Sequence, residues 1–547
     1  FFEYMRIILD NRYSWISTNV GIYTVHYIGS FDNLLPIIEA IVLLGEKPNS
    51  EYVSSIVNKL VSPGAVIMQS KQTIIAFTDH FRCYPIFYTM VDSGIICNSA
   101  RKLKDLIGFD YGEWDTLAAE EFAMSGYVTG SGTLFKNIKQ LQSGECLISD
   151  SENNSINIVR YYRYTPIQEQ GRSDSDWIDE LESVMSGVID RMVERANGRR
   201  IKLPLSAGLD SRLLACGLHE YGYDNLETFS YGLPGNWEAR GAKEVAKRLN
   251  LPWKLITTSR HEARQVFWSK QRKDFFSFSD GLSSLPNLQE FYPMSKMHQS
   301  GGSTEDTIII NGQTGDFISG GHITSELLQP GADVRTLLDR ILNKHYALWR
   351  SLMTKDRTER IEAKVLGLLG VDINTKLTID ELVSLYERWE CEERQCKWVI
   401  NGQRMYDFFG YDWQLPLWDV ELVRFFQKVP NHLKFNQRLY RLWLERWDYK
   451  NLFREFNPVV WRWPGAAISV VPLAKSVDIV LGKHAKQRCY EVFGYWNHYS
   501  EHFAPYTYKE YFKVSNDIRN NISLNVRTWA NENNLSSEIV NIGQDIK

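Results

Sequence analysis

The sequence is poor in cysteine and shows no regular cysteine spacing. Its 547 residues include 7 cysteines, an odd number scattered from Cys83 to Cys489. Such a set does not suggest a disulfide framework, and it predicts free thiols in a reducing, cytoplasmic compartment. The pair Cys391 and Cys396 has no second Cys or His pair at zinc-finger spacing, so the sequence predicts no metal role for it.

Long apolar runs and an excess of basic charge are also missing. No run approaches the roughly 18 apolar residues of a membrane helix, and no basic stretch precedes an apolar core. We therefore expect neither a membrane span nor a secretory signal. Lys and Arg number 62 against 66 Asp and Glu, and no basic block stands out. This balance argues against nucleic acid or an anionic membrane as a partner.

What the sequence has is the composition of a soluble globular protein, with 44% apolar and 23% charged residues. Its length predicts two to three domains. Residues 13–164 show strand-like segments, among them "GIYTVHYI", "GAVIMQ", "TIIAFTD" and "GIICNS", with helical patterns at "NLLPIIEAIVLL" and "DTLAAEEFAMSG". This pattern predicts a β-rich α+β domain over residues 1–170, followed by a helix capped at Ser175 or Asp176.

From residue 176 the pattern changes to strands that alternate with helices. "RIKLPLS", "LETFSYG" and "TIIINGQTGD" are strand-like, whereas "DSRLLACGLHEYG" and "EARGAKEVAKRLN" are helical. Alternation of this kind predicts a parallel sheet covered by helices. Helical patterns dominate after residue 330, so we expect a second domain over residues 176–547 whose C-terminal part is largely helical.

Two small-residue loops follow strands of this predicted sheet. "SAGLDS" (residues 206–211) lies between a strand and a helix, where backbone N–H groups and the positive helix end can cradle an anion. It is not a Walker loop, because the chain has no GxxxxGK[ST]. "NGQTGDFISGGH" (residues 311–322) follows the strand "TIII". Asp210 and Asp316 are thereby predicted to hold Mg²⁺ against phosphate oxygens.

These motifs resemble those of a known family. "LSAGLDS" is similar to the SGGxDS pyrophosphate loop of N-type ATP pyrophosphatases, and residues 228–256 resemble the stretch that follows it in asparagine synthetases. "NGQTGDFISGG" keeps the spacing of that family's GEGSDELFGG loop, with Gly320 and Gly321 in register, and residues 410–434 resemble its GVEARVPFLD segment. The resemblance implies that ATP and pyrophosphate are bound by Ser206, Ala207, Gly208, Leu209, Asp210, Ser211, Ser230, Tyr231, Gly232, Gly312, Gly315 and Asp316.

The first domain resembles the glutaminase half of the same family. "FTDHFRCYPIFY" is similar to DRFGIRPLYY, and "GTLFKNIKQLQSGECLISD" resembles the strand pair that closes that half. The fold class implied is α/β: an N-terminal α+β sandwich of the Ntn (glutaminase-like) type, then a parallel-sheet domain of the PP-loop, HUP-like type. The family's glutaminase uses an N-terminal cysteine, but this chain reads "FFEYMRIILD", and only Gly64 matches the family's Asn-Gly pair. We expect a silent domain; a start before Phe1 is the alternative.

The synthetase half also departs from the family pattern. The family's catalytic Glu falls on Asp412 and its Arg on Gln414, and the family lysine would fall near Pro464. We expect Asp412 to act on the amine, and Arg438, Arg441 or Lys450 to supply the missing cation, with Arg438 as the chosen candidate. His322 replaces an aromatic residue and is expected to pack rather than to act in catalysis.

The mechanism implied by the resemblance uses ATP and Mg²⁺. A substrate carboxylate, from aspartate or a sugar acid, attacks the α-phosphorus and releases pyrophosphate; ammonia or an amine then displaces AMP and forms an amide. A cyclase of the same architecture, of the β-lactam synthetase or lasso-peptide type, and an inactive scaffold are the alternatives. The oligomeric state is left open, with a homodimer as one option.

Overall fold

The computed structural model describes most of the chain. It covers residues 5–108, 113–150, 155–232, 234, 236–301, 304–456 and 505–535, and, between 473 and 489, residues 473–482, 485, 486 and 489. The predicted lysine position near Pro464 lies outside the described residues.

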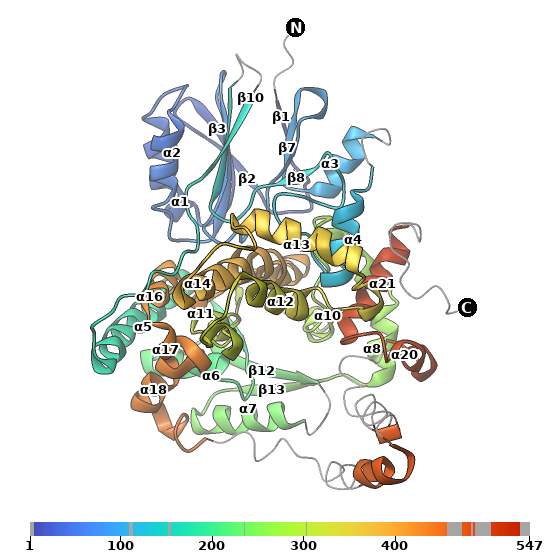
Figure 1. Cartoon of the computed structure of the whole chain (residues 1–547). Coiled ribbons are helices and arrows are strands. Elements are labelled where there is room, and N and C mark those ends of the chain that lie inside the picture. Colours follow the sequence, from blue (N-terminus) through green and yellow to red (C-terminus); the bar gives the residue numbers. More distant parts are fainter. Residues whose placement is uncertain are drawn as a thin grey trace.

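Two β-sheets form the N-terminal part of the molecule (Figure 1). A six-stranded antiparallel sheet has the order β10-β9-β5-β4-β3-β2. Its strands are β2 (Ile16–Val20), β3 (Tyr23–Gly29), β4 (Gly64–Gln69), β5 (Ile74–Thr78), β9 (Glu145–Asp150) and β10 (Ser155–Arg160). The other sheet has the order β1-β7-β6-β8, with β1 (Arg6–Ile8), β6 (Phe87–Thr89), β7 (Ile95–Cys97) and β8 (Lys139–Gln140). The predicted strands and the β-rich α+β character are confirmed.

Alternating side chains explain how these sheets stack. In β4, Val66 and Met68 pack toward α1 (Phe31–Val42) and α2 (Ser50–Val57), whereas Ile67 packs toward the four-stranded sheet. Because successive residues of a strand point to opposite faces, one apolar strand can fill two cores. On the far face of the second sheet, Phe87 packs against α3 (Ala100–Ile107) and α4 (Thr116–Ser125) in the largest core. The N-terminal part therefore has α, β, β and α layers.

The second sheet system is a five-stranded parallel sheet with the order β13-β12-β11-β14-β15. Its strands are β11 (Arg200–Pro204), β12 (Leu226–Gly232), β13 (Trp253–Thr257), β14 (Thr307–Ile310) and β15 (Asp412–Gln414). The chain moves outward from β11 to β13 and then returns to the other side of β11 with β14. Strands β11 and β14 therefore flank the topological switch point, where α/β sheets bind ligands at the carboxyl ends of their strands.

Helices cover this sheet and connect it to the N-terminal part. Those next to the sheet are α5 (Asp174–Ala196), α6 (Leu209–Tyr221), α7 (Trp237–Arg248), α8 (Arg260–Phe267), α9 (Lys270–Ser279), α10 (Phe291–Gln299) and α11 (Gly315–Ile318). The later ones are α12 (Val334–His345), α13 (Lys355–Leu369), α14 (Ile379–Trp389), η4 (Glu390–Val399), α15 (Arg404–Phe408), α16 (Val420–Lys428), α17 (Asn431–Lys434), α18 (Arg438–Trp447), α20 (Tyr508–Val514) and α21 (Asn521–Glu532). Among the described residues, no helix is long and apolar enough to cross a membrane.

Two details differ from the sequence-based expectations. Helix α5 is capped by Ser173, whose side chain accepts from the Asp176 backbone while the Asp176 carboxylate accepts from that of Ser173. Asp176 is thus the third residue of a capping box rather than the cap itself. The helical C-terminal part also contributes the short strand β15, because Asp412 to Gln414 pair with Ile308 to Ile310 of β14.

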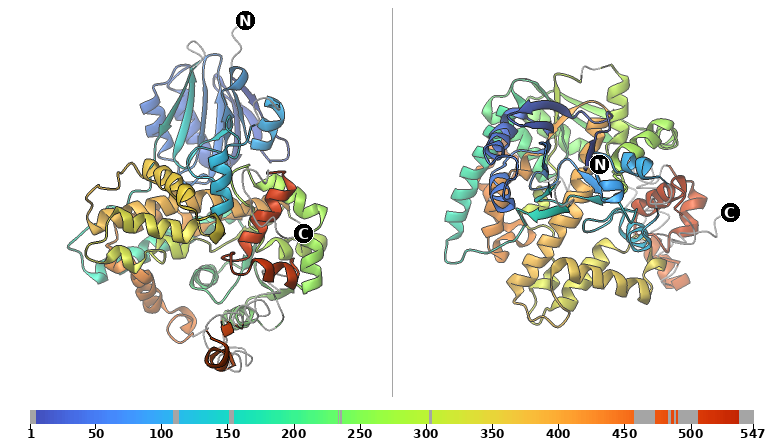
Figure 2. Two further views of the ribbon diagram at one scale, coloured as in Figure 1. Left: turned by 45° about the vertical axis from the view of Figure 1, so that its right-hand side comes forward. Right: turned by 90° about the horizontal axis from the view of Figure 1, so that it is seen from above.

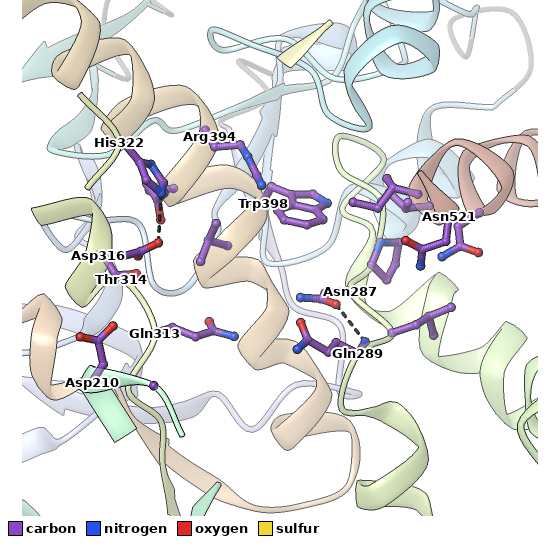
Figure 3. Close-up of a pocket in the computed structure, with 18 of the residues that line it drawn as sticks. Asp210, Asn287, Gln289, Gln313, Thr314, Asp316, His322, Arg394, Trp398 and Asn521 are labelled. Atoms are coloured by element: carbon purple, nitrogen blue, oxygen red, sulfur yellow. Dashed lines mark hydrogen bonds and ion pairs between the residues drawn. The ribbon is translucent and has the colours of Figure 1, made fainter. Parts of the chain in front are cut away.

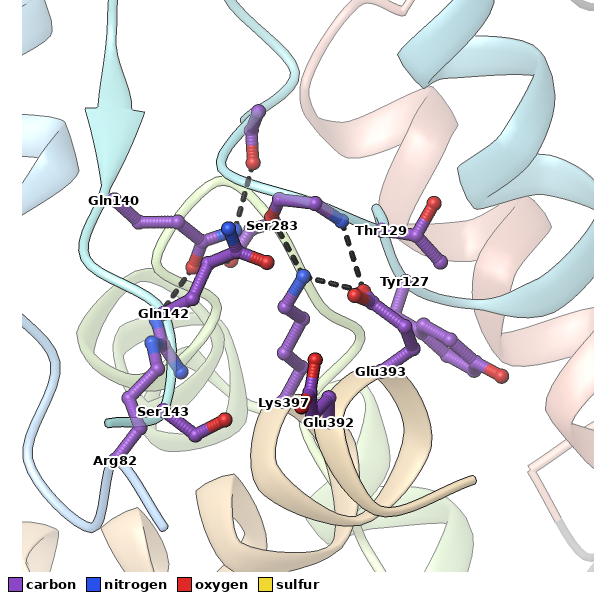
Figure 4. A network of polar contacts seen from close by, with 12 residues as sticks. Arg82, Tyr127, Thr129, Gln140, Gln142, Ser143, Ser283, Glu392, Glu393 and Lys397 are labelled. Atoms are coloured by element: carbon purple, nitrogen blue, oxygen red, sulfur yellow. Dashed lines mark hydrogen bonds and ion pairs between the residues drawn. The ribbon is translucent and has the colours of Figure 1, made fainter. Parts of the chain in front are cut away.

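A buried polar network joins the N-terminal part to η4 (Figure 4). Lys397 Nζ lies 2.5 Å from both the Gly130 carbonyl oxygen and Glu393 Oε2, and the Gly130 N–H donates to the same carboxylate at 2.8 Å. Nearby, Arg82 Nε donates to the Leu141 carbonyl oxygen at 3.0 Å. Figure 2 shows the N-terminal sheets seated on the helices of the second part. The bonds from the buried Lys397 and Glu393 to Gly130 connect the two parts.

Candidate functional site at the switch point of the parallel sheet

The loop after β11 has the shape of an anion cradle. Gly208 is the N-cap of α6 and supplies no side-chain acceptor to the first N–H groups of that helix. The Ser211 hydroxyl accepts from the Ser206 N–H at 3.0 Å, and the Ser206 hydroxyl accepts from the Gly208 N–H at 3.0 Å. These bonds tighten the turn, while the N–H groups and positive end of a 13-residue helix point out of it.

The loop after β14 lies directly against this cradle. A Cβ atom at Gly312 would lie 3.0 Å from the carbonyl carbon of Asp210, and one at Gly315 would collide with the Asp210 carboxyl group and lie 2.7 Å from Leu417 Cδ1. Only glycine allows such close approach of the two backbones. The two predicted loops therefore face each other across the end of the sheet.

This approach places two carboxylates side by side. Tyr440 donates to Asp210 Oδ1 at 2.9 Å. Burial, followed by the nearby charge of Asp316, raises the pKa of Asp210 to about 7. Like charges at a partly desolvated site repel one another, and a bound cation removes that repulsion. The predicted metal-ligating residues Asp210 and Asp316 are thus brought together, at a position that suits a divalent cation shared with phosphate oxygens.

His322 belongs to this site, contrary to the expectation that it only packs. Its Nε2 lies 3.2 Å from Asp316 Oδ2, and its Nδ1 lies 2.9 Å from Glu390 Oε1. Burial opposes a positive charge on this ring, but the bonds to Asp316 and Glu390 outweigh it and raise the pKa of His322 to about 9. Burial alone would raise the pKa of Asp316, yet His322 lowers it. His322 therefore keeps Asp316 ionised.

The fully buried Glu390 anchors this chain of charges. Besides His322, its carboxylate lies 3.1 Å from Lys344 Nζ and 2.8 Å from His345 Nε2. Residues 322, 345 and 390 come from three different helices or loops, and no sequence spacing connects them. Sequence reasoning could not have found this group.

The predicted residues of β12 serve the framework of the site. The Ser230 hydroxyl donates to the Leu205 carbonyl oxygen at 2.6 Å and accepts from Trp253 Nε1 at 2.9 Å. The Tyr231 hydroxyl lies 3.3 Å from Glu290 Oε1. Gly232 has a φ of +115°, which glycine adopts without strain. Together with the buried Ala207, these residues fix the position of the cradle, whereas Leu209 reaches the cavity.

The two predicted catalytic residues lie away from the facing loops, which corrects that part of the prediction. Asp412 stands at the amino end of β15, is 68% exposed and pairs with Arg199, which directly precedes β11. It therefore faces the opposite edge of the sheet from Asp210. Arg438 points toward the start of α5 and bonds Asp174 at 2.9 Å. Local motif position could not show either pairing, because each joins residues more than 200 positions apart.

A cavity of about 660 Å³ opens where the two loops meet (Figure 3). Gly208, Asp210 and Asp316 line one end, and Thr314 and Arg441 also reach it. Thr314 has a left-handed backbone (φ +85°), and its buried hydroxyl has no hydrogen-bond partner within the described part of the chain. Strain of this kind is tolerated mainly at functional positions. Of the three cations proposed from the sequence, Arg441 is the one that lines this cavity.

The residues at the loop end fit a magnesium-bound phosphate group. Two neighbouring carboxylates, the unpartnered Thr314 hydroxyl and the start of α6 offer oxygen ligands for the cation and N–H donors for the anion. The described residues contain no group of three or more His, Cys, Asp or Glu side chains that could hold a metal by themselves. The arrangement therefore suits a cation that binds together with a phosphate group, which supplies its remaining ligands.

Small-residue loops and paired carboxylates at the switch point of a parallel sheet define the class of α/β proteins that bind phosphorylated ligands. Within that class, the family model of asparagine synthase matches residues 191–463. This part of the chain is an asparagine synthase domain, and that family implies an ATP-dependent amide-forming ligase.

No curated protein matches the chain. Among solved structures, it is similar to glutamine phosphoribosylpyrophosphate amidotransferase from B. subtilis complexed with ADP and GMP, at 11% identity and a TM-score of 0.17. That match covers 54% of this chain and 62% of the other, and at this TM-score it supports no conclusion about the fold or the activity.

Proposed function

We propose that this chain is an ATP-dependent carbon–nitrogen ligase of the asparagine synthase type, which adenylates a carboxylate and then amidates it. The observation that supports this most directly is the contact between the loops at residues 206–211 and 311–316, with Asp210 and Asp316 side by side. We also propose the finer fold assignment, a PP-loop, HUP-like domain after an Ntn-type sandwich; the five-stranded parallel sheet and the two stacked N-terminal sheets support it.

The cradle at the start of α6 would bind the phosphates of ATP, and Asp210, Asp316 and Thr314 would hold Mg²⁺. When bound, the cation neutralises phosphate charge and helps pyrophosphate leave. His322 keeps Asp316 ionised for this task. Holding both reactants in line and neutralising charge supplies most of the rate enhancement.

A substrate carboxylate oxygen attacks the α-phosphorus, the bond from that phosphorus to the bridging oxygen breaks, and pyrophosphate leaves with the electron pair. The nitrogen of ammonia then attacks the acyl carbon, AMP leaves, and the nitrogen loses a proton to a base. Of the cations proposed from the sequence, Arg441 lines the cavity and can meet the charge developing at the phosphorus.

The test is pyrophosphate release from Mg·ATP with a panel of carboxylic acids and ammonium chloride. We expect release with at least one acid, and its loss in Asp210→Ala. A protein that binds ATP yet releases no pyrophosphate with any acid would be the inactive scaffold. Turnover of a substrate carrying its own amine, with no added ammonium, would identify the cyclase alternative.

We also infer that the N-terminal domain has no glutaminase activity. Its three cysteines, Cys83, Cys97 and Cys146, are all buried. Burial raises the pKa of Cys83 well above its ordinary value, and that of each of the other two to about 12. A neutral, buried thiol is a poor nucleophile. Ammonium should therefore support amide formation and glutamine should not; equal rates with both would refute this inference.

A further inference from the structure

The cavity extends well beyond the phosphate loops. From Asp210 and Asp316 it continues between η4 and the Asn287–Gln289 segment to the start of α21, where Asn521 lines it (Figure 3). We call this extension the distal arm. The whole cavity has a volume of about 660 Å³, which lies within the range of small-molecule sites.

One wall of the distal arm is an unusual helix. Residues Glu390–Val399 form a π-helix, η4, of ten residues. Such helices are rare and occur often at functional sites, because the wider turn changes which side chains share a face. Here Arg394, Gln395 and Trp398 all line the cavity, and Glu390 at the same helix start holds His322.

Arg394 offers the arm a positive charge that has no ion-pair partner among the described residues. Its guanidinium lies over the Trp398 ring, 3.9 Å from the centroid, which fixes its orientation. Within the described part of the chain, no carboxylate or other acceptor bonds this guanidinium. An oriented guanidinium with free N–H groups is suited to a carboxylate, which it can hold through two parallel bonds.

Unpartnered polar atoms lie beside this cation. Gln395 is 3% exposed, yet its Oε1 has no hydrogen-bond partner among the described residues. The buried Nε1 atom of Trp398 likewise has no partner among them. A buried polar group without a partner costs free energy, so its presence in a cavity wall indicates a ligand that completes the bond. The amides of Asn287, Gln289 and Asn521 add further donors and acceptors.

Among its described residues, the arm also lacks a feature that an amino-acid substrate requires. The acidic residues that line the cavity are Asp210 and Asp316, both at the phosphate end; the described lining of the arm contains no carboxylate. The α-ammonium group of aspartate would enter this arm without a counter-charge, which is unfavourable at a desolvated site. Hydroxyl groups, in contrast, match amide and indole partners.

We propose that the distal arm binds a hydroxyl-rich organic acid without an α-ammonium group, with Arg394 holding its carboxylate and Gln395 and Trp398 bonding its hydroxyls. This inference rests on the ligase function proposed above and specifies its acyl substrate class. A hexuronic acid is the simplest compound of this kind.

The experiment measures pyrophosphate release from Mg·ATP and ammonium with D-glucuronate, D-galacturonate, L-aspartate and a short peptide with a free C-terminus. We expect kcat/KM to be higher for a uronate than for aspartate or the peptide. Arg394→Gln should raise the KM for that uronate about tenfold or more, as expected for lost bonds to a charged group, and leave the KM for ATP within about twofold. Arg394→Lys should also raise the uronate KM, since a point charge cannot replace the planar fork.

Arg335→Gln is the matched control, because Arg335 pairs with Glu362 on the surface, away from the cavity. Binding of Mg·ATP, followed by tryptophan fluorescence, verifies that each variant folds. Faster turnover of aspartate or the peptide, or an unchanged uronate KM in Arg394→Gln, would overturn the arm assignment and leave the ligase standing. No release with any acid would overturn both.

Discussion

Asp210 shows how one residue connects binding to stability. Burial of its carboxyl group, and secondly the nearby charge of Asp316, raises its pKa to about 7 from an ordinary value of 3.8. The folded protein therefore holds this proton more tightly than the unfolded chain does. Stability from this group is present below about pH 4 and is lost as the pH rises toward and through 7, by up to about 4 kcal/mol in total.

At the residue scale, we expect the variant Asp210→Asn not to lose this stability as the pH rises. Without ligand, its melting temperature should match that of the wild type near pH 4 and exceed it at pH 8, because the neutral amide ends the repulsion from Asp316. Pyrophosphate release should disappear, since the cation loses a charged ligand. Thermal unfolding from pH 4 to pH 8 measures the first effect; a difference between the two proteins that does not vary with pH would contradict it.

At the scale of elements, the loop between β14 and α11 depends on glycine. A side chain at Gly315 would occupy the space of the Asp210 carboxyl group. We expect Gly315→Ala to push the two loops apart, to lower pyrophosphate release by at least about tenfold and to cost about 1–3 kcal/mol of stability.

Gly367 in α13 provides the matched control for this substitution. No atom lies within 4 Å of a Cβ placed there, and its backbone is helical. Gly367→Ala should therefore stabilise the protein by up to about 1 kcal/mol and leave activity unchanged. If Gly315→Ala behaved in the same way, the close approach of the two loops would not matter for function.

At the scale of the whole molecule, buried charges hold the N-terminal part against η4. Lys397 is 1% exposed and bonds both Glu393 and the Gly130 carbonyl oxygen. We expect Lys397→Met to destabilise the protein by about 3–5 kcal/mol, because it leaves Glu393 buried without a counter-charge. The double variant Lys397→Met with Glu393→Gln should be less destabilised than the single one.

Thermal unfolding followed by tryptophan fluorescence checks this expectation. Lys355→Met is the control, because Lys355 is 90% exposed and its loose surface pair contributes little. A Lys397→Met protein as stable as the wild type would show that the two parts are held together by other contacts.

Local sequence patterns were sufficient to predict the main elements and the two loops of the site. Periodic apolar residues predicted β3, β4, α4 and α6, because strand and helix periods are local properties. Loops that follow neighbouring parallel strands must meet at one edge of the sheet, so the sequence alone predicted that Asp210 and Asp316 lie close together. Motif position could not assign catalytic side chains, as Asp412 and Arg438 show.

Tertiary structure decided the remaining features of the site. Tyr440 and Asp210 are 230 positions apart, and His322 and Glu390 are 68 apart. No local period or spacing connects such residues. Their contacts arise only when helices from distant segments pack on the same end of the sheet. The same packing creates the distal arm and places Arg394 in its wall, where no described residue pairs with it. The environment of each side chain is set by the packing of the whole molecule. The pKa values and the unsatisfied hydrogen-bonding groups, on which the chemistry depends, are therefore set by that packing too.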